Sequence, residues 1–225
     1  MTRYKYIAIE GPIGAGKTTL AHILAAELNG KLILENYLQN PFLEKFYQDM
    51  PHHAFNTQIF FLISRYQQQI DSVQQFSLFH SYLIADYSFP KDRIFACLTL
   101  TDKELTVYSK IYHSLEKDIL KPDLILYLKA STDVLLQRIM QRDRGMEHGI
   151  TSDYLHSLNM AYNQFFKHYA ASPVYSIDTN SIDLTQPGQG RESLIQAIME
   201  LLNQKTNLAH YFQPSRPDSI LRKEN

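Results

Sequence analysis

The sequence predicts an α/β fold in which helices flank one sheet of five parallel strands. Short apolar or β-branched runs alternate with longer stretches of helical periodicity, a pattern typical of β-α-β units. A glycine-rich turn between the first apolar run and an amphipathic segment supports the same fold. We expect the five strands at residues 4–10, 31–35, 81–86, 123–130 and 174–178.

The longest helix is expected over residues 53–74. Phe55, Ile59, Leu62 and Tyr66 recur there at helical spacing. Residues 179–190 are rich in turn-forming side chains and are expected to form a loop before the last helix. Further helices are expected at residues 102–120, 131–142, 151–169 and 191–205.

The composition is typical of one globular domain, with 225 residues of which 44% are hydrophobic and 20% charged. We assign residues 1–205 to that domain and the polar residues 206–225 to a C-terminal tail. A formal net charge of −1 with scattered Lys and Arg argues against a nucleic acid polymer as partner. The single cysteine allows no intrachain disulfide, and no apolar run is long enough for a signal peptide or a membrane span. We therefore expect a cytoplasmic protein.

The run GPIGAGKTT carries the strongest chemical signal. It satisfies the pattern G-x-x-x-x-G-K-[ST] directly after an apolar strand and before a helix. The backbone N–H groups of such a turn surround phosphate oxygens, and the positive end of the helix dipole adds to the attraction. Lys17 is expected at the β- and γ-phosphates of a nucleoside triphosphate, and the Thr18 hydroxyl at Mg²⁺. The expected phosphate-binding residues are Gly11, Gly14, Ala15, Gly16, Lys17, Thr18 and Thr19.

Two acids close predicted strands at the same edge of the sheet as this turn. Glu35 ends the run KLILE, and Asp86 ends the run SYLIAD. A carboxylate can accept the proton of an alcohol that attacks phosphorus, and a second one can hold the water shell of Mg²⁺. Glu35 is the candidate base and Asp86 the candidate metal-side acid, and both are expected to contact the substrate. Taken singly, either acid could instead cap a helix or lie solvated in a loop.

Together these motifs resemble the deoxynucleoside kinase family over about residues 4–169. GPIGAGKTT resembles its phosphate loop, LEN resembles the strand end that carries its base, and DYSFPKDRIFA resembles the segment with its acid-Arg-Ser motif. The resemblance implies a P-loop kinase fold and a homodimer. It also implies phosphorylation of the 5′-hydroxyl of a deoxynucleoside by ATP and Mg²⁺, for nucleotide salvage.

The run RIMQRDRGME resembles the arginine-rich lid of this family, expected at about residues 138–150. Arg138, Arg142, Arg144 and Glu147 match its pattern. The resemblance implies that the arginines close over the donor phosphates, with Arg142 and Arg144 in catalytic roles, and that the glutamate contacts the sugar 3′-hydroxyl. Guanidinium groups one helical turn apart also suit phosphate oxygens. Without the resemblance, arginines at a helix end would be a solvated face.

The long helix carries the family's pattern for recognising the base. Gln58 and Arg65 are seven residues apart, about two turns, and therefore share a face. The resemblance implies that Gln58 binds the base edge, Arg65 pairs with Asp92, and Tyr47 contacts the sugar 3′-hydroxyl. Three phenylalanines are candidates for the walls of the base site, namely Phe55, Phe61 and Phe89.

Tyr87 departs from the family pattern, in which an arginine commonly follows the strand-end acid. A cation is missing from that position, so Lys17 and the lid arginines would have to stabilise the transferring group. The pair DY resembles the bacterial deoxyguanosine and deoxyadenosine kinase branch. An ionised Asp92 near the base could only accept hydrogen bonds, which disfavours thymine. These features predict that the substrate is deoxyadenosine or deoxyguanosine, and deoxycytidine stays open as an alternative.

Two other functions stay open from the sequence. A nucleoside monophosphate kinase such as a thymidylate kinase shares the phosphate loop and the lid, but Glu35 would repel the phosphate of its acceptor. A nucleotide-dependent switch is the second alternative. It is disfavoured because no Asn-Lys-x-Asp guanine-recognition pattern occurs in the chain.

Overall fold

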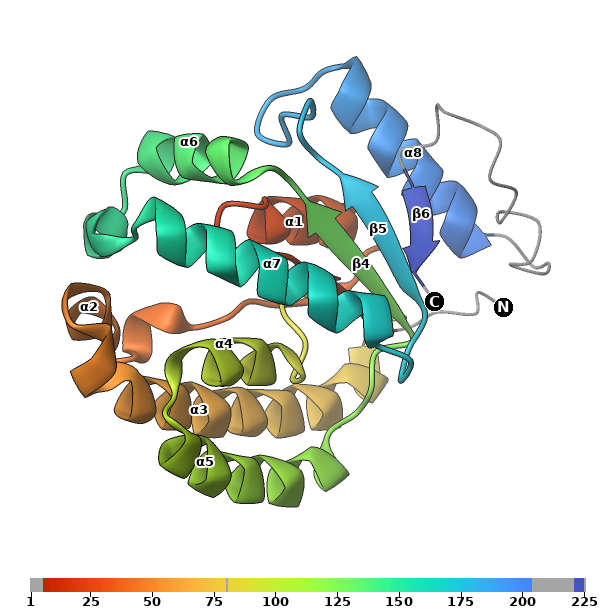
Figure 1. Ribbon diagram of the computed structural model, residues 1–225. Coiled ribbons are helices and arrows are strands. Elements are labelled where there is room, and N and C mark those ends of the chain that lie inside the picture. The colour runs from red at the N-terminus through yellow and green to blue at the C-terminus, as the bar shows by residue number, and fades with distance from the viewer. Residues whose placement is uncertain (1–5, 80, 204–220, 225) are drawn as a thin grey trace.

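The computed structural model describes residues 6–79, 81–203 and 221–224 (Figure 1). One sheet runs through it, with the strand order β2-β3-β1-β4-β5-β6. All neighbouring strands pair in parallel except β6, which pairs with β5 antiparallel. The strands are β1 Tyr6–Glu10, β2 Lys31–Ile33, β3 Leu83–Ala85, β4 Leu124–Lys129, β5 Val174–Asp178 and β6 Leu221–Glu224.

Eight α-helices and three short 3₁₀ segments lie in the described residues. Figure 1 shows α3, α4 and α5 stacked beside one another below the sheet, with α7 between them and the strands β4 and β5. The α-helices are α1 Lys17–Glu27, α2 Leu43–Gln48, α3 Met50–Phe79, α4 Lys91–Thr99, α5 Asp102–Leu115, α6 Thr132–Arg142, α7 Ser152–His168 and α8 Gln189–Asn203. The 3₁₀ segments are η1 Tyr37–Gln39, η2 Glu116–Asp118 and η3 Gly145–Gly149.

The central strands are almost entirely apolar because helices cover both faces of the sheet. Every residue of β1 is buried, and so are all residues of β4 except its last. Buried parallel strands lose the alternation of a half-exposed strand and become continuous hydrophobic runs. This burial explains why the runs YIAIE and LILYLK predicted strands so well.

Side-chain caps set the beginnings of several helices. The Ser131 hydroxyl accepts a hydrogen bond from the Val134 amide at the start of α6, and Thr151 accepts one from Tyr154 at the start of α7. Thr101 and Glu104 form a capping box at the start of α5. Such caps satisfy the orphan amides of the first helical turn.

The expected strands and helices are confirmed, with shifted ends. β2 and β3 are shorter than expected, so Glu35 lies two residues beyond its strand and Asp86 directly after its strand. The long helix is longer than expected and covers 30 residues. The helix expected at residues 102–120 ends at Leu115 and continues as a 3₁₀ turn.

The expectation of a loose tail over residues 206–225 is wrong for its last part. Residues 221–224 form β6, which pairs with the outer edge of β5. An open edge of a parallel sheet exposes unpaired backbone groups that a further strand can satisfy. The part of the tail before β6 lies outside the described residues.

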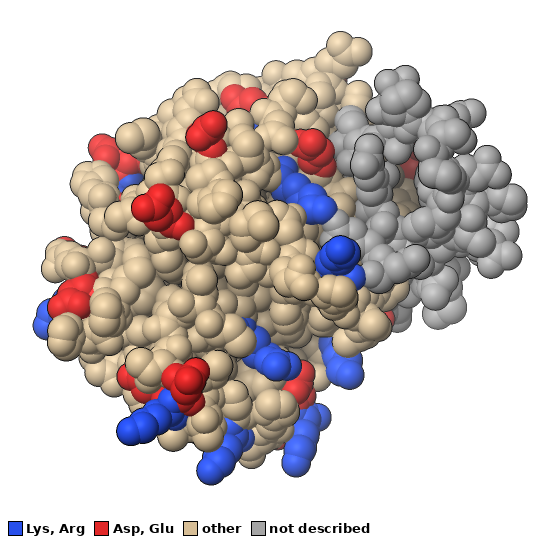
Figure 2. Space-filling model, viewed as in Figure 1, with Lys and Arg blue, Asp and Glu red and all other residues tan. Residues whose placement is uncertain are grey.

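Charges of both signs are interspersed on the face shown in Figure 2, in keeping with the small net charge. Within the described residues, no helix combines the length and the apolar character needed to cross a membrane.

Candidate active site

The glycine-rich turn lies between β1 and α1, at the carboxyl end of the central strand. Gly14 and Gly16 have φ angles of 86° and 94°, a left-handed backbone that favours glycine. A Cβ on Gly14 would lie 2.7 Å from the Leu135 carbonyl oxygen, so α6 packs directly on the turn. The sequence thus allows a tight backbone cradle in front of the first turn of α1.

Lys17 closes this cradle from inside. Its Nζ donates to the carbonyl oxygens of Gly11 at 2.7 Å and Pro12 at 2.9 Å. Burial and the nearby charge of Lys91 lower the pKa of Lys17 to about 8. A phosphate would relieve this charge crowding, because it brings further negative charge to the two lysines.

The expected metal-side pair is in contact. The Thr18 hydroxyl donates to Asp86 Oδ2 at 2.6 Å, and the Glu35 amide donates to Asp86 Oδ1 at 2.7 Å. Asp86 therefore connects the first turn of α1 with the backbone that follows β2. Because the strands are parallel, both acids reach the same edge of the sheet, as the sequence predicted.

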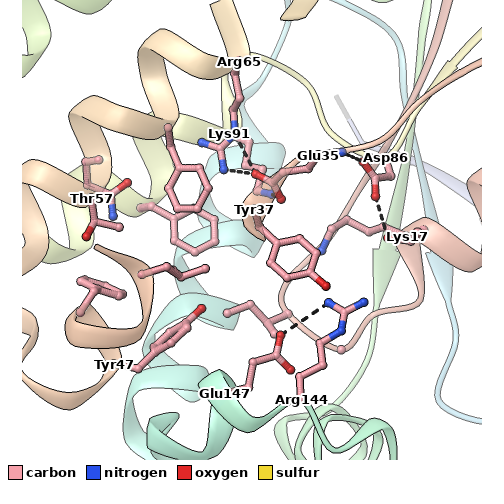
Figure 3. A pocket seen from close by; sticks show the side chains of 18 of the residues that line it. Lys17, Glu35, Tyr37, Tyr47, Thr57, Arg65, Asp86, Lys91, Arg144 and Glu147 are labelled. Carbon is pink, nitrogen blue, oxygen red and sulfur yellow. Dashed lines mark hydrogen bonds and ion pairs between the residues drawn. The ribbon is translucent and has the colours of Figure 1, made fainter. Parts of the chain in front are cut away.

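The carboxylate of Glu35 lies between two cations (Figure 3). Arg65 of α3 contacts Oε1 through Nε at 2.8 Å and through Nη2, and Lys91 of α4 contacts Oε2 at 2.6 Å. Burial alone would raise the pKa of Glu35, but the charges of Arg65 and Lys91 outweigh burial and hold the pKa well below its usual range. Glu35 is thus ionised and fixed in orientation.

Arg65 also pairs with Asp92, as expected from the sequence. Asp92 is fully buried and lies behind Arg65, outside the set of side chains that line the cavity. Its Oδ1 pairs with Arg65 and its Oδ2 has no hydrogen-bond partner, so a contact of Asp92 with the base stays a prediction.

A cavity extends from Lys17 and Asp86, past Glu35, to an apolar end. Phe46, Phe61 and Phe95 line it together with Tyr47. Of the three phenylalanines expected as walls, Phe61 is the one that lines this cavity. The expectation is wrong for the other two phenylalanines. Phe55 lines a surface pocket beside α3, and Phe89 stacks on Tyr112 in a separate core cluster. Phe55 lies on a face of α3 away from the cavity, and Phe89 lies in the turn before α4.

The apolar end also holds polar groups without partners. Gln58 is 2% exposed; its Nε2 lies 3.4 Å from the Thr99 hydroxyl, and its Oε1 has no hydrogen-bond partner. The fully buried Thr57 hydroxyl is likewise unpartnered. Buried polar atoms without partners are costly, so these atoms suit a ligand that supplies hydrogen bonds. Figure 3 places Thr57 at the end of the cavity opposite to Lys17.

The lid expected at about residues 138–150 covers the other side of the cavity. Arg142 makes a two-pronged ion pair with Glu147, at 2.8 and 2.7 Å. The Arg144 guanidinium lies over the Tyr37 ring, 4.7 Å from its centroid, and Arg144 lies 3.7 Å from Glu147. All four side chains line the cavity with the phosphate loop. The lid thus holds its cations close to the cradle.

Arg138 is placed apart from the other lid arginines. It donates to the Thr179 hydroxyl and to the carbonyl oxygens of Thr179 and Ile182, and it does not line the cavity. It therefore anchors the loop before α8, in which Leu184 packs against Gly16. A direct contact of Arg138 with the donor nucleotide stays a prediction.

Tyr87 has a structural position. Its side chain is fully buried, and its hydroxyl donates to Gln68 Oε1 at 2.7 Å. Gln68 in turn donates to the Leu34 carbonyl oxygen at 2.7 Å, just before Glu35. Tyr87 thus supports the backbone of the candidate base through α3 and brings no charge to the site.

The sequence did not single out Lys91, Phe95, Thr57 or Tyr37. Lys91 and Phe95 both lie in the run DYSFPKDRIFA and are four residues apart. This helical spacing was the available signal that they share one face of a helix. Because α4 begins at Lys91, its first turn and its second turn face the cavity with Lys91 and Phe95. Sequence spacing alone could not show that this helix packs beside Glu35.

The arrangement can bind an elongated ligand with a polyanionic end and a flat apolar end. The anion would meet the backbone turn, Lys17 and the lid arginines, whereas the flat end would lie between phenylalanines with polar atoms at its edge. Glu35 lies at the junction, where an alcohol could approach it.

Comparisons with known proteins identify similar chains. The family model described as deoxynucleoside kinase matches residues 7–203. A deoxyguanosine kinase of Bacillus subtilis (strain 168) is 39% identical over 90% of this chain and 100% of that protein. A deoxyadenosine kinase of Dictyostelium discoideum is 36% identical over 72% of this chain and 66% of that protein. The structure of a deoxyadenosine kinase from M. mycoides with bound dATP matches with a TM-score of 0.75 and 26% identity, over 89% of this chain and all of that one.

Proposed function

The chain belongs to the deoxynucleoside kinase family, and we propose that it transfers the γ-phosphoryl group of ATP to the 5′-hydroxyl of a purine deoxynucleoside. It is thus a phosphotransferase that acts on a nucleoside hydroxyl. The observation that carries the proposal is the position of Glu35, ionised between Arg65 and Lys91 where the phosphate cradle meets the apolar end of the cavity.

Phosphoryl transfer in this site follows from the positions of the side chains. As the 5′-oxygen forms its bond to the γ-phosphorus, the bond from that phosphorus to the β,γ-bridging oxygen breaks and ADP leaves. The hydroxyl proton passes to Glu35, which is ionised and can accept it. Lys17, Arg142 and Arg144 stabilise the charge on the phosphoryl oxygens, and the lid excludes water that would otherwise hydrolyse ATP.

The residues present fit Mg²⁺ as a partner of the triphosphate. Thr18 and Asp86 offer oxygen ligands 2.6 Å apart beside the cradle. Among the described side chains, no group of three His, Cys, Asp or Glu is gathered to hold a metal alone. Such a site suits an ion that is shared with phosphates and water, as Mg²⁺ usually is. When bound, Mg²⁺ would neutralise charge on the β- and γ-phosphate oxygens.

The preference for a purine rests on two supports. Relatives named as deoxyguanosine and deoxyadenosine kinases share 39% and 36% identity with this chain. The free Gln58 Oε1 offers an acceptor for an exocyclic amino group, which adenine and guanine carry and thymine lacks. Cytosine also carries an amino group, so deoxycytidine is the acceptor against which the preference must be measured.

One assay tests the reaction and the preference. The protein is incubated with Mg-ATP and each of the four deoxynucleosides, and the monophosphate formed is measured. We expect the highest kcat/KM with deoxyguanosine or deoxyadenosine. Four flat traces beside strong activity on a deoxynucleoside monophosphate would assign the chain to the monophosphate kinases. ATP hydrolysis that no acceptor stimulates would favour the nucleotide-dependent switch.

The role of Glu35 has its own test. Glu35→Gln keeps the shape of the side chain but removes the proton acceptor, so we expect kcat to fall on the order of a hundredfold or more. Thermal unfolding of the variant, compared with wild type, controls for folding. Near-normal turnover by Glu35→Gln would remove Glu35 from the role of base.

Two further expectations from the sequence stay proposals. A homodimer is expected from the family resemblance, and light scattering of the purified chain measures it. The cytoplasmic location is an expectation that fractionation of the source cells would test.

A further inference from the structure

Lys91 is a buried cation in the cavity to which the family motifs assign no role. It is 3% exposed, and its Nζ lies 2.6 Å from Glu35 Oε2. It is the first residue of α4, and α4 packs against α3 and α7. These contacts set the position of the Lys91 backbone independently of Glu35.

Burying a lysine ammonium is unfavourable unless a carboxylate and further polar groups compensate for lost hydration. Lys91 lies close to a second lysine, Lys17, and its charge is among the causes that lower the pKa of Lys17. The repulsion between these two lysines lowers the stability of the fold, and a bound polyanion would offset it. Two adjacent lysines in a cavity are unfavourable for folding alone, whereas both charges attract a polyanionic ligand.

The two oxygens of Glu35 are shared between two helices. Arg65 on α3 takes Oε1, and Lys91 on α4 takes Oε2. Asp92 fixes Arg65 from behind, so the Oε1 contact belongs to a rigid buried pair. The Oε2 contact depends on Lys91, and Lys91 lines the cavity from which an acceptor alcohol would arrive.

The residue at position 87 supplies no cation to the cavity beside Glu35. Tyr87 is buried and its hydroxyl is bonded to Gln68. From this segment of the chain, Lys91 is the cation that lines the cavity, four residues after Tyr87.

We propose that Lys91 is a positioning residue for phosphoryl transfer, which holds Glu35 Oε2 toward the acceptor hydroxyl and brings a positive charge to the junction of base and phosphate cradle. The inference rests on the proposed function and adds a residue to it. Lys91 neither takes nor gives the transferred proton; it acts through Glu35.

The test compares four variants with wild type in steady-state assays with Mg-ATP and the best deoxynucleoside. Lys91→Met removes the charge, Lys91→Gln keeps a hydrogen bond to Glu35 without the charge, and Lys91→Arg keeps the charge. Arg93→Met is the matched control, because Arg93 lies on the same helix, is exposed, and contacts Tyr112 outside the cavity. Thermal unfolding of each protein accompanies the kinetics.

We expect Lys91→Met and Lys91→Gln to lower kcat roughly tenfold to a hundredfold while the KM for ATP changes little. Lys91→Arg should regain much of that loss, and Arg93→Met should match wild type. A kcat close to wild type in Lys91→Gln would overturn the proposal, as would a kcat loss in Lys91→Arg as large as that in Lys91→Met.

The same assay keeps the two proposals apart. Wild-type turnover with a deoxynucleoside reports on the proposed function, whereas the ratio of variant to wild-type kcat reports on Lys91. Should Lys91→Met fail to fold, Lys91→Gln still decides the outcome, because it preserves the polar contact with Glu35.

Discussion

Glu35 shows how single residues in this site are controlled by their neighbours. A carboxylate in a cavity would ordinarily gain a proton, because burial disfavours its charged form. Arg65 and Lys91 reverse that effect and keep the charge. The same two contacts fix the direction of the carboxylate, so the candidate base is oriented before the substrate arrives.

The pairing of Asp92 with Arg65 is predicted to contribute to the free energy of unfolding. Asp92→Ala removes one partner of the buried Arg65, and losing one member of a buried pair costs up to about 3–5 kcal/mol. We expect a loss at the lower end of that range, because Glu35 still pairs with Arg65. Thermal or urea unfolding measures it.

Asp71→Ala is the control for this measurement, since Asp71 is an exposed acid on α3. An unfolding free energy of Asp92→Ala equal to that of Asp71→Ala would show that the buried pair contributes nothing net.

The phosphate loop is the element whose shape depends most on glycine. Gly14→Ala would place a Cβ 2.7 Å from the Leu135 carbonyl oxygen, at a φ angle of 86°. The turn or α6 must then move, which displaces the amides that face the phosphates. A displacement of about 1 Å can cost on the order of a hundredfold in rate, so we expect kcat/KM for ATP to fall at least tenfold.

Gly188→Ala is the matched substitution, because a Cβ there meets no atom within 4 Å. It should leave kcat/KM for ATP unchanged. Equal kinetics for Gly14→Ala and Gly188→Ala would contradict the packing argument.

The segments that follow β2 and β3 contact each other and together position Glu35. Asp86 binds the amide of Glu35, and Tyr87 supports the backbone before Glu35 through Gln68. Both residues that follow β3 therefore hold the segment that follows β2. Tyr87, a departure from the family pattern, contributes to the placement of Glu35, the candidate base.

For the whole molecule, ligand binding should stabilise the fold. The cavity is lined by side chains from the phosphate loop, α2, α3, α4 and the lid, so a ligand bound there connects elements across the domain. At a hundredfold excess over its Kd, a ligand adds about 2.7 kcal/mol to the unfolding free energy. For a chain of this length we expect Tm to rise by about 5–10 °C.

Differential scanning fluorimetry with the preferred deoxynucleoside checks this expectation, and a ribonucleic acid polymer serves as a negative control. An unchanged Tm at saturating deoxynucleoside would contradict binding in this cavity.

Local signals along the chain were sufficient for the fold class, the order of the strands along the chain and the phosphate loop. Buried parallel strands are continuous apolar runs, and the glycine pattern encodes its own backbone geometry, so both are visible without the tertiary structure. The placement of Glu35 and Asp86 at one edge follows from the same rule for parallel strands.

The packing of helices against that edge was decided only by the tertiary structure. Lys91 and Phe95 of α4 enter the cavity, Asp92 pairs with Arg65, and Phe55 on α3 faces elsewhere, because the rotation of α3 and α4 depends on their neighbours. The pairing of residues 221–224 with β5 is equally non-local. Contacts between distant segments depend on the shapes of both partners, which spacing within either segment does not contain.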